Sequence, residues 1–306
     1  MLRRSFITLA SAIGMAAALA LPAAAAEITH AMGTTTVPDA PQRVVVLTNE
    51  GTEALLEIGV VPVGAVRSWL GDPWYDHIAG QMADVAVVGD ESAVNLELIA
   101  ALQPDLIIGN KTRQEKIYDQ LSAIAPTVFA ERLRGDWKIN LDLYSRAVGK
   151  GAEGQAALAN FDARAAALGE AMGDLKAEQV SLVRFMPNMT RIYYNDTFAG
   201  IIFKQIGMAR PPQQDNPEFA ADVTRERIPE MEGDRLFYFV YETGDGAGDK
   251  QASDWLADPL WNNLEVVKAG KAYPVSDAIW NTAGGIIAAN LLLDDIAKAY
   301  GVTIAP

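Results

Sequence analysis

The sequence contains no cysteine and only two histidines among its 306 residues. Without cysteine, a thiol nucleophile, a disulfide framework and the lipid anchor of a lipoprotein are not expected. His30 lies near the start of the predicted mature chain, where disorder is common, and His77 is expected to be a surface or packing residue. With two distant histidines and no Gly-x-Ser-x-Gly motif, neither a protein-held metal nor a catalytic residue is predicted.

Long apolar runs are also missing, except at the N-terminus. Two arginines at 3–4 precede an apolar stretch at 6–21, and small residues at 24–26 suit a cleavage site. This pattern predicts an export signal over residues 1–26. Residues 3–7 also resemble a twin-arginine motif, so both export routes stay open, and a retained anchor is a lesser alternative. A soluble periplasmic protein is predicted.

Basic residues are scarce relative to acidic ones. The chain has 25 Lys and Arg against 39 Asp and Glu. Removing Arg3 and Arg4 with the predicted signal leaves 23 basic residues and a net charge of −16. Such a chain is not expected to bind nucleic acid. An anionic ligand would require a local cluster of basic side chains acting against the overall field.

The order of apolar runs indicates an α/β protein. Strand-like runs alternate with helical segments in the first half, and this order predicts a parallel sheet covered by helices. These runs are 43–47, 60–66, 86–88, 106–109 and 127–129. In the second half, strands are predicted at 180–185, 191–194, 236–240, 266–267 and 272–275, the first two forming a hairpin.

Three units follow the predicted signal. An N-terminal α/β lobe is expected at 27–150 and a C-terminal α/β lobe at 176–306, the latter ending in a helix at about 282–300. Between them, residues 151–175 carry apolar side chains at three- and four-residue spacing, as one face of a helix does. A helix of this length, about 36 Å, is long enough to connect two lobes.

One short unit occurs twice, once in each predicted lobe. Asn95-Leu96-Glu97 and Thr224-Arg225-Glu226 each open an apolar helical pattern that runs into a strand. Asn and Thr are good N-cap residues, and a Glu in the first turn suits the helix dipole. The matched placement of Glu97 and Glu226 indicates a shared role, although both residues also fit a purely helix-capping one.

Arginine and aromatic side chains follow several of the predicted strands. Ligands of parallel α/β sheets bind beyond the carboxyl ends of the strands, so these side chains are candidates for a cleft that binds a carboxylate-rich anion or metal chelate. The alternative is that most are solvated surface residues, and Lys111 and Arg132 are the residues most expected to be so. The candidates are Arg67, Arg113, Arg134, Trp137, Tyr241 and Trp280, together with Arg184 and Arg191, which flank the tip of the predicted hairpin. Arg184→Ala is expected to weaken binding with little effect on melting temperature.

Residues 104–127, 184–187 and 278–285 carry a more specific signal. Through them, nearly the whole mature chain resembles the binding components of iron-siderophore ABC importers, the class III periplasmic binding proteins. The resemblance is to the branch for ferric siderophores built on citrate with hydroxamate arms, such as schizokinen, and the ferric citrate branch is not separable from it. It implies two Rossmann-like lobes joined by one long helix, with the ligand in the cleft between them.

The resemblance also implies a function and partners. A monomeric, non-enzymatic receptor would capture the ferric siderophore, whose iron arrives inside the chelate, so that no cofactor is needed. It would deliver the chelate to an inner-membrane permease with its ATPase, and Glu97 and Glu226 would dock on that permease. One alternative keeps the fold and binds haem or cobalamin, with Tyr193 or Tyr241 as axial ligand of haem. Another is a periplasmic enzyme acting on a metal chelate.

Overall fold

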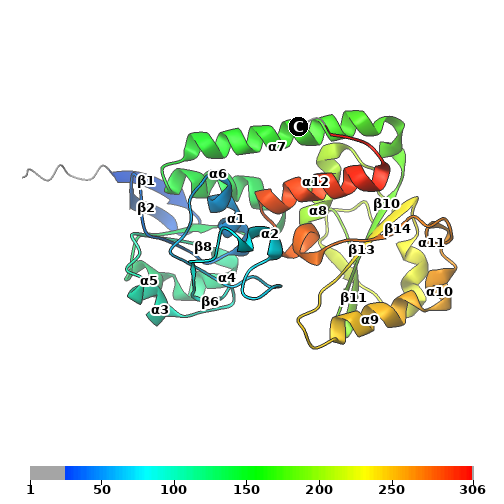
Figure 1. Ribbon diagram of the computed structural model, residues 1–306, viewed down its shortest axis with the longest axis horizontal. Helices are drawn as coiled ribbons and strands as arrows, with labels where there is room; N and C mark the ends of the chain where they lie inside the picture. Colours follow the sequence, from blue (N-terminus) through cyan, green and yellow to red (C-terminus); the bar gives the residue numbers. More distant parts are fainter. Residues whose placement is uncertain (1–24, 305–306) are drawn as a thin grey trace, which may run out of the picture.

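The computed structural model describes residues 25–304. The predicted signal at 1–26 lies outside this range except for Ala25 and Ala26, which begin β1 (Ala25–His30). None of the helices in the described part of the chain is long and apolar enough to cross a membrane. The elements form two α/β lobes side by side, with a long helix running over both (Figure 1).

Each lobe is built on a five-stranded sheet. The N-terminal sheet has the order β5-β4-β3-β8-β9, and all its paired strands are parallel. Its strands are β3 (Val44–Val46), β4 (Gly64–Ala65), β5 (Ala86–Val87), β8 (Leu106–Asn110) and β9 (Thr127–Ala130). The three central strands β3, β4 and β8 are fully buried, which is why their sequences are continuous apolar or small-residue runs.

The C-terminal sheet is mixed and has the order β12-β11-β10-β13-β14. Its strands are β10 (Val180–Met186), β11 (Met189–Tyr193), β12 (Ala220–Asp222), β13 (Arg235–Val240) and β14 (Ala272–Pro274). The predicted hairpin is present, with Met186 opposite Met189 and Asn188 in the left-handed region at φ 59°. The predicted strand at 266–267 is wrong, because these residues belong to the helix α11 (Glu265–Lys268).

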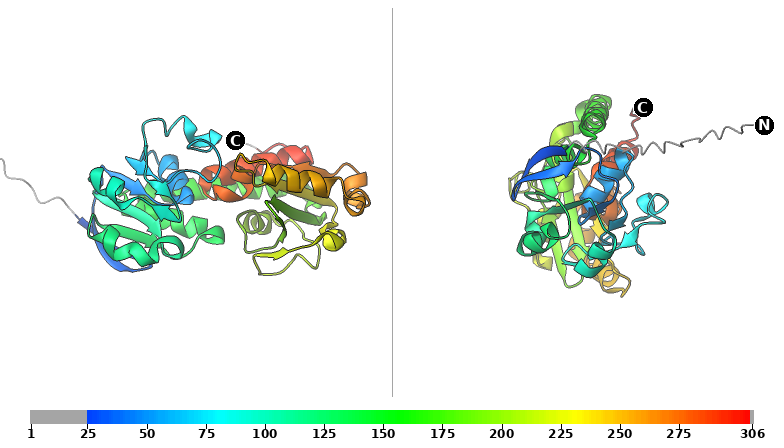
Figure 2. Two further views of the ribbon diagram at one scale, coloured as in Figure 1. Left: turned by 90° about the horizontal axis from the view of Figure 1, so that it is seen from below. Right: turned by 90° about the vertical axis from the view of Figure 1, so that its left-hand side faces the viewer.

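The helical region between the lobes is interrupted where its glycines lie. Helix α6 (Trp137–Ala147) ends before Gly149, whose φ is 72°, and α7 (Gly151–Met172) begins two residues later. A Cβ at Gly149 would lie 1.9 Å from the carbonyl oxygen of Asp39, so no other residue fits this turn. At 22 residues, α7 is about 33 Å long. It extends over both lobes, and its buried stripe faces them (Figure 2).

The last helix, α12 (Ile286–Tyr300), lies beside α7 and reaches the N-terminal lobe (Figure 1). Its first turn contacts α1 (Asn49–Glu57), where the backbone N–H of Ala288 donates to Oε2 of the fully buried Glu53 at 2.9 Å. The other oxygen of Glu53 pairs with Nε2 of His77 at 2.5 Å, so His77 is a packing residue, as predicted. One apolar core therefore includes α1, α7 and α12 and continues from one lobe into the other.

The repeated unit is only partly regular. Asn95 caps α3 (Leu96–Ala101) as predicted, with its Oδ1 accepting from the N–H of Leu98 at 3.0 Å. The second copy is a 3-10 helix, η4 (Arg225–Met231), and no cap bond comes from Thr224. Pro229 lies inside η4 and has no N–H for an α-helical bond, which explains the difference.

His30 is ordered in β1, so the expectation of disorder there is wrong. Its Nδ1 accepts from the N–H groups of Met32 and Phe129 at 3.3 and 3.2 Å, and Nε2 bonds the hydroxyl of Thr35 at 2.9 Å. Burial lowers the pKa of His30. The ring is therefore a neutral structural link between the β1–β2 ribbon, completed by β2 (Gly33–Pro38), and β9.

Candidate ligand-binding cavity between the lobes

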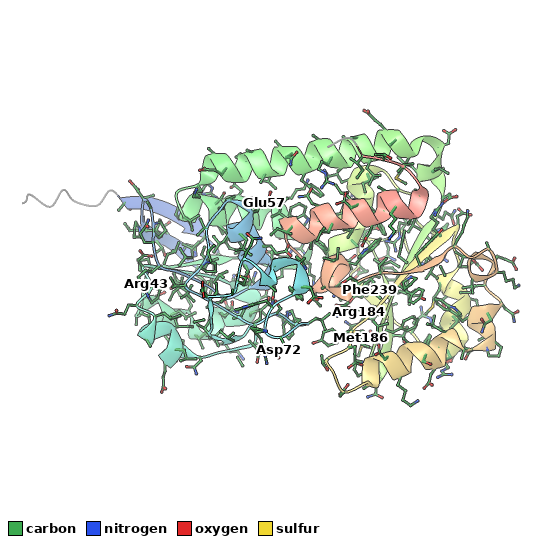
Figure 3. All side chains as sticks on the ribbon, in the orientation of Figure 1. Arg43, Glu57, Asp72, Arg184, Met186 and Phe239 are labelled. Atoms are coloured by element: carbon green, nitrogen blue, oxygen red, sulfur yellow. The ribbon has the colours of Figure 1, made fainter. Side chains whose placement is uncertain are left out.

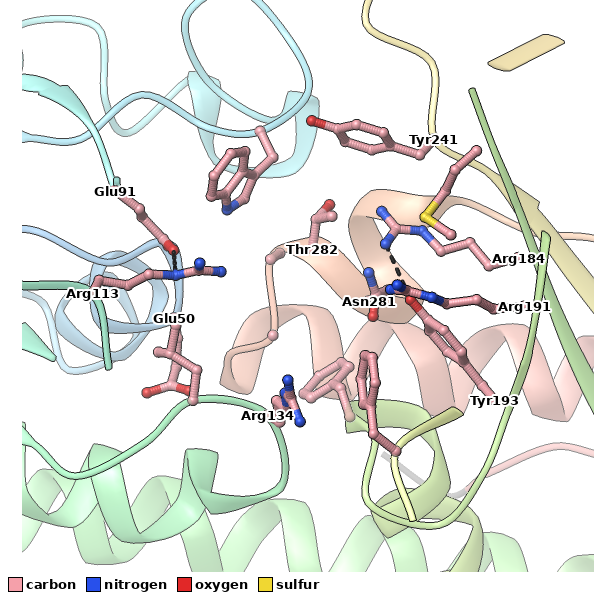
Figure 4. A pocket seen from close by; sticks show the side chains of 17 residues that line it. Glu50, Glu91, Arg113, Arg134, Arg184, Arg191, Tyr193, Tyr241, Asn281 and Thr282 are labelled. Carbon is pink, nitrogen blue, oxygen red and sulfur yellow. Dashed lines mark hydrogen bonds and ion pairs between the residues drawn. The ribbon is translucent and has the colours of Figure 1, made fainter. Parts of the chain in front are cut away.

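A cavity of about 370 Å³ lies between the two lobes. One side, the N-terminal wall, consists of Glu50, Trp69, Glu91, Arg113, Leu133 and Arg134. The other side, the C-terminal wall, consists of Arg184, Met186, Arg191, Tyr193, Phe198, Phe219, Tyr241 and residues 281–284. Four arginines from opposite sides thus line one space, together with aromatic rings (Figure 4). Figure 3 shows Arg184 and Met186 on the edge of the C-terminal lobe that faces the N-terminal lobe.

Arg184, on β10, is fixed by a buried ion pair. Its Nε donates to Oδ2 of Asp277 at 2.6 Å, and its Nη2 donates to Oδ1 at 3.1 Å. Its Nη1 donates to the hydroxyl of Tyr193 at 3.1 Å, and the guanidinium lies 4.8 Å from the ring of Tyr241. Burial by itself would lower the pKa of Arg184, but Asp277 and Tyr193 raise it above its usual value. This arginine is therefore charged and held in one orientation.

Arg191 and Arg134 approach the same aromatic ring. Arg191, on β11, pairs with Asp222 of β12 at 2.6 Å, and its guanidinium carbon is 5.8 Å from the centre of the Phe219 ring. Arg134 follows β9 in the other lobe, and its guanidinium carbon is 4.0 Å from the same ring. Its φ of 78° is unusual for a residue with a side chain. Phe219 thus links guanidinium groups from both walls.

On the N-terminal wall, Arg113 is held less tightly. It lies on α4 (Lys111–Gln114), directly after β8, and its Nε is 3.7 Å from Oε2 of Glu91. The ring of Trp69 is 5.7 Å from its guanidinium carbon. Glu91 itself is fixed, because its Oε1 accepts from the N–H and the side-chain amide of Asn49 at 2.6 and 2.9 Å. Burial raises the pKa of Glu91 above its usual value.

Glu50 is a second acidic residue on this wall, and it is only 5% exposed. It is the second residue of α1, the helix that follows the central strand β3. Its Oε1 accepts from the amide of Asn140 at 2.7 Å. Burial raises the pKa of Glu50 well above its usual value; the hydrogen bond from Asn140 opposes this shift, and nearby carboxyl groups add to it. Burial therefore favours the neutral, hydrogen-bonding form of Glu50 more than solvent would.

The structure brings together five of the eight residues predicted to line the cleft, namely Arg113, Arg134, Arg184, Arg191 and Tyr241. Whether they contact a ligand stays a prediction. Arg67 lies outside the lining and is 3.5 Å from Asp72, with both side chains exposed. Lys111 and Arg132, expected to be bystanders, also lie outside it and form ion pairs with Glu131, Asp136 and Asp196.

The prediction that Trp137 and Trp280 line the cleft is wrong, because both rings are buried in the core. Trp137 is 1% exposed, and its ring centre lies 4.9 Å from that of Phe161 on α7. Trp280 is fully buried and donates its indole N–H to Asp295 at 2.8 Å. The sequence neighbours of Trp280 at 281–284 do line the cavity. Trp280 therefore anchors this part of the C-terminal wall from behind.

Sequence reasoning missed Glu50, Trp69 and Glu91. A signal for Glu50 exists in the sequence, since the residue follows the central strand after a short loop, at the edge of the sheet where ligands bind. For an anionic ligand, this rule points to basic and aromatic side chains and passes over a carboxylate. Within residues 25–304, no group of three or more histidine or acidic side chains is arranged to hold a metal ion.

Comparison with known proteins assigns the chain to a family. A model described as periplasmic binding protein matches residues 44–277. The chain belongs to this family. The probable siderophore-binding lipoprotein YfiY of Bacillus subtilis is 53% identical over 283 residues, covering 89% of this chain and 87% of YfiY. The Fe(3+)-citrate-binding protein YfmC of the same species is 30% identical over 276 residues, covering 87% of this chain and 83% of YfmC.

A solved structure agrees with this assignment. Staphylococcus aureus SirA, complexed with staphyloferrin B, superposes with a TM-score of 0.83 at 34% identity, covering 91% of this chain and 99% of SirA. The predicted α/β fold with two lobes, a long connecting helix and a cleft between the lobes is confirmed. The resemblance to binding proteins of iron-siderophore importers is also confirmed at the level of the family.

Proposed function

We propose that this periplasmic binding protein captures a ferric siderophore of the citrate or citrate–hydroxamate type and delivers it to an ABC importer. One observation carries the proposal: four arginines from two lobes line one cavity in a chain whose net charge is −14. A concentrated positive field in an acidic protein suits a small multivalent anion. The named ligands of YfiY, YfmC and SirA, which are siderophores and ferric citrate, support this choice.

The other candidate ligands have less support. Haem would require an axial side chain, and the hydroxyl of Tyr193 already accepts a hydrogen bond from Arg184. Burial raises the pKa of Tyr193, which disfavours the phenolate that would bind iron. The relatives named above are binding proteins, and none of them favours cobalamin or an enzymatic reaction.

Tryptophan fluorescence tests the ligand assignment directly, because Trp69 lines the cavity. Ferric schizokinen and ferric citrate, titrated separately, should quench the emission saturably, and the iron-free forms should quench it less. Trp69→Phe should reduce the quenching while calorimetry still detects binding. Trp137→Phe is the matched control, since that ring is buried in the core and should report less of the ligand. Tight binding of haem or cobalamin without binding of either chelate would reject the assignment.

We also propose that Glu97 and Glu226 contact the permease. Both side chains are exposed, and they come from different lobes, on α3 and η4. Rim charges of this kind steer and register a complex without adding much to the stability of the free protein. The combined change Glu97→Ala with Glu226→Ala should leave chelate affinity intact and abolish uptake by cells. Glu170→Ala with Glu265→Ala, which also removes two exposed acids, should leave uptake unchanged. Normal uptake in the first variant would show that Glu97 and Glu226 do not contact the permease and serve only at their helix N-termini.

For location and assembly, we propose an exported, unanchored monomer. YfiY is named a lipoprotein, whereas this sequence has no cysteine to carry a lipid. Cell fractionation should recover the protein in the soluble periplasmic fraction, and light scattering should give the mass of one chain. Recovery with membranes after a high-salt wash would contradict the unanchored form.

A further inference from the structure

Four carboxyl groups gather at the N-terminal wall, and three of them have a basic side chain as partner. Glu53 pairs with His77, Glu91 is 3.7 Å from Arg113, and Asp136 pairs with Arg132 at 2.9 Å. The fourth, Glu50, accepts from the neutral amide of Asn140 and forms no ion pair with any residue of the described chain, 25–304. It nevertheless lines the cavity that holds the four arginines.

We propose that Glu50 takes up a proton from solvent when an anionic ferric chelate enters the cavity, and that the resulting O–H donates a hydrogen bond to an oxygen of the chelate. The inference rests on the proposed function, because it requires an anionic ligand. It makes Glu50 a ligand-binding residue that responds to pH.

The surroundings of Glu50 decide which form the ligand favours. Arg113 and Arg134 line the same cavity and favour the ionised carboxylate, as does its place in the first turn of α1. Burial, the three neighbouring carboxyl groups, and the absence of a cationic partner oppose it. From α6, the buried Tyr144 is the other nearby titratable group, and its pKa is raised well above the usual range, so it stays neutral. From α12, Gly285 at the N-cap lies near the backbone oxygen of Glu50; it has no charged side chain, and the dipole of α12 also favours the carboxylate.

A bound chelate shifts this balance toward the protonated form. Its carboxylates would occupy the guanidinium groups of Arg113 and Arg134 and would place further negative charge near Glu50, across from Arg184 and Arg191 (Figure 4). Like charges in a buried site raise the pKa of the weaker acid. The Oε1 atom already has Asn140 as a donor, so a proton on Oε2 would not break that bond. Binding and protonation therefore favour each other.

Calorimetry across the neutral pH range, in buffers of different ionisation enthalpy, tests the inference with ferric citrate and ferric schizokinen. The parent protein should take up as much as roughly one proton per chelate, and its affinity should fall with rising pH by at most about tenfold per pH unit. Glu50→Gln should bind without proton uptake and with a flat pH profile. Glu57→Gln changes an exposed residue of the same helix and should behave like the parent.

A further pair of variants tests the hydrogen bond. Glu50→Gln keeps an N–H donor and should bind about as tightly as the parent at low pH, whereas Glu50→Ala should bind roughly two- to tenfold more weakly. Unchanged proton uptake in Glu50→Gln, or none in the parent, would overturn the proposal.

If neither chelate binds the parent, the proposed function fails, and infrared titration of the free protein still tests Glu50. In the parent, a carboxylic acid band that is missing from Glu50→Gln should persist at pH values above those at which solvated glutamates ionise. If this band disappears together with those of the solvated acids, Glu50 does not hold a proton and the proposal is wrong.

Discussion

Arg184 on the C-terminal wall and Arg113 on the N-terminal wall face the same cavity, but their acidic partners hold them differently. Arg184 makes two hydrogen bonds to Asp277 and a third to Tyr193, all of them buried. Arg113 has one contact of 3.7 Å with Glu91, and 41% of its side chain is exposed. The C-terminal wall is therefore fixed before the ligand arrives, whereas the N-terminal wall can adjust to it.

Because of this difference, substitution of the two arginines should affect different properties, namely the stability of the fold and the affinity for ligand. A buried arginine cannot be removed without leaving its carboxylate partner unpaired, and that cost is large. A half-exposed arginine can be removed more cheaply, because water replaces much of what it loses. Removal of Arg184 should thus reduce the stability of the fold, whereas removal of Arg113 should mainly reduce the affinity for ligand.

The largest effect is expected for Arg184→Ala. The change leaves Asp277 buried without its cation, so the free energy of unfolding should fall by about 3–5 kcal/mol. The sequence alone led us to expect little effect on the melting temperature, and the ion pair overturns that expectation. Urea unfolding measures the loss, and the double variant Arg184→Met with Asp277→Leu should recover part of it. A single variant as stable as the parent would mean that the pair is not formed.

A smaller effect, confined to binding, is expected for Arg113→Ala. A guanidinium bonded to a chelate carboxylate contributes roughly 1.5–3 kcal/mol, so affinity should fall about ten- to hundredfold. Glu91 keeps its two bonds from Asn49, and the melting temperature should change little. Titration calorimetry and thermal unfolding of the same sample check both parts. A large loss of stability in Arg113→Ala would show that this arginine supports the fold as Arg184 does, and would contradict the difference between the two walls.

A weaker effect is expected where the two walls meet at Phe219. Phe219→Leu keeps an apolar side chain and removes the ring beside Arg134 and Arg191. Cation–π contacts contribute about 0.5–1 kcal/mol each at partly exposed sites, so affinity should fall by a factor of about two to ten. Phe219→Tyr, which keeps the ring, should bind like the parent. Equal affinity of the Leu and Tyr variants would show that the ring only fills space.

The smallest effects concern the pH dependence of folding stability. A carboxyl group in each lobe contributes to it, and the two contributions should change with pH in opposite directions. The N–H groups of Gly246 and Asp249 help lower the pKa of Glu242, next to Tyr241, to about 2. Its contribution to stability is present above the usual value of 4.5 and is lost as pH falls toward 2. Glu50, whose pKa is raised, is most favourable to folding at low pH and becomes less so as pH rises through its folded pKa.

Melting temperatures of two variants across the pH range check these signs. The difference between the parent and Glu242→Gln should shrink as the solution is acidified. The melting temperature of Glu50→Gln should increase relative to that of the parent as pH rises. Parallel pH profiles for all three proteins would contradict both assignments.

The sequence predicted the fold and the position of the cavity better than the orientation of individual side chains. The order of buried runs predicted the parallel N-terminal sheet, and the rule that ligands bind beyond strand ends predicted Arg113 and Arg134. That rule does not say which way a residue turns. Trp137 begins a helix whose inner face packs on Phe161, and it points into the core. Such an orientation depends on tertiary packing, which no local pattern encodes.

The acidic residues were missed for a different reason. Glu50 lies in a polar segment that was recognised as following a strand, but a carboxylate was not expected beside an anion. The pairing of Glu91 with Arg113 joins residues 22 positions apart, the first in a turn and the second on α4. Only the folded chain shows that these acids share a wall, and that Glu50 differs from its neighbours in lacking a basic side chain as partner.

The contact between α12 and Glu53 also bears on how the protein is made. The N–H of Ala288 satisfies a carboxylate that is otherwise sealed inside the N-terminal lobe, and the apolar side of α12 completes the core around α1. The 15-residue helix α12 is thus a structural part of the first lobe, although it is synthesised after that lobe. The part of the N-terminal core around α1 is therefore completed only after α12 has been synthesised.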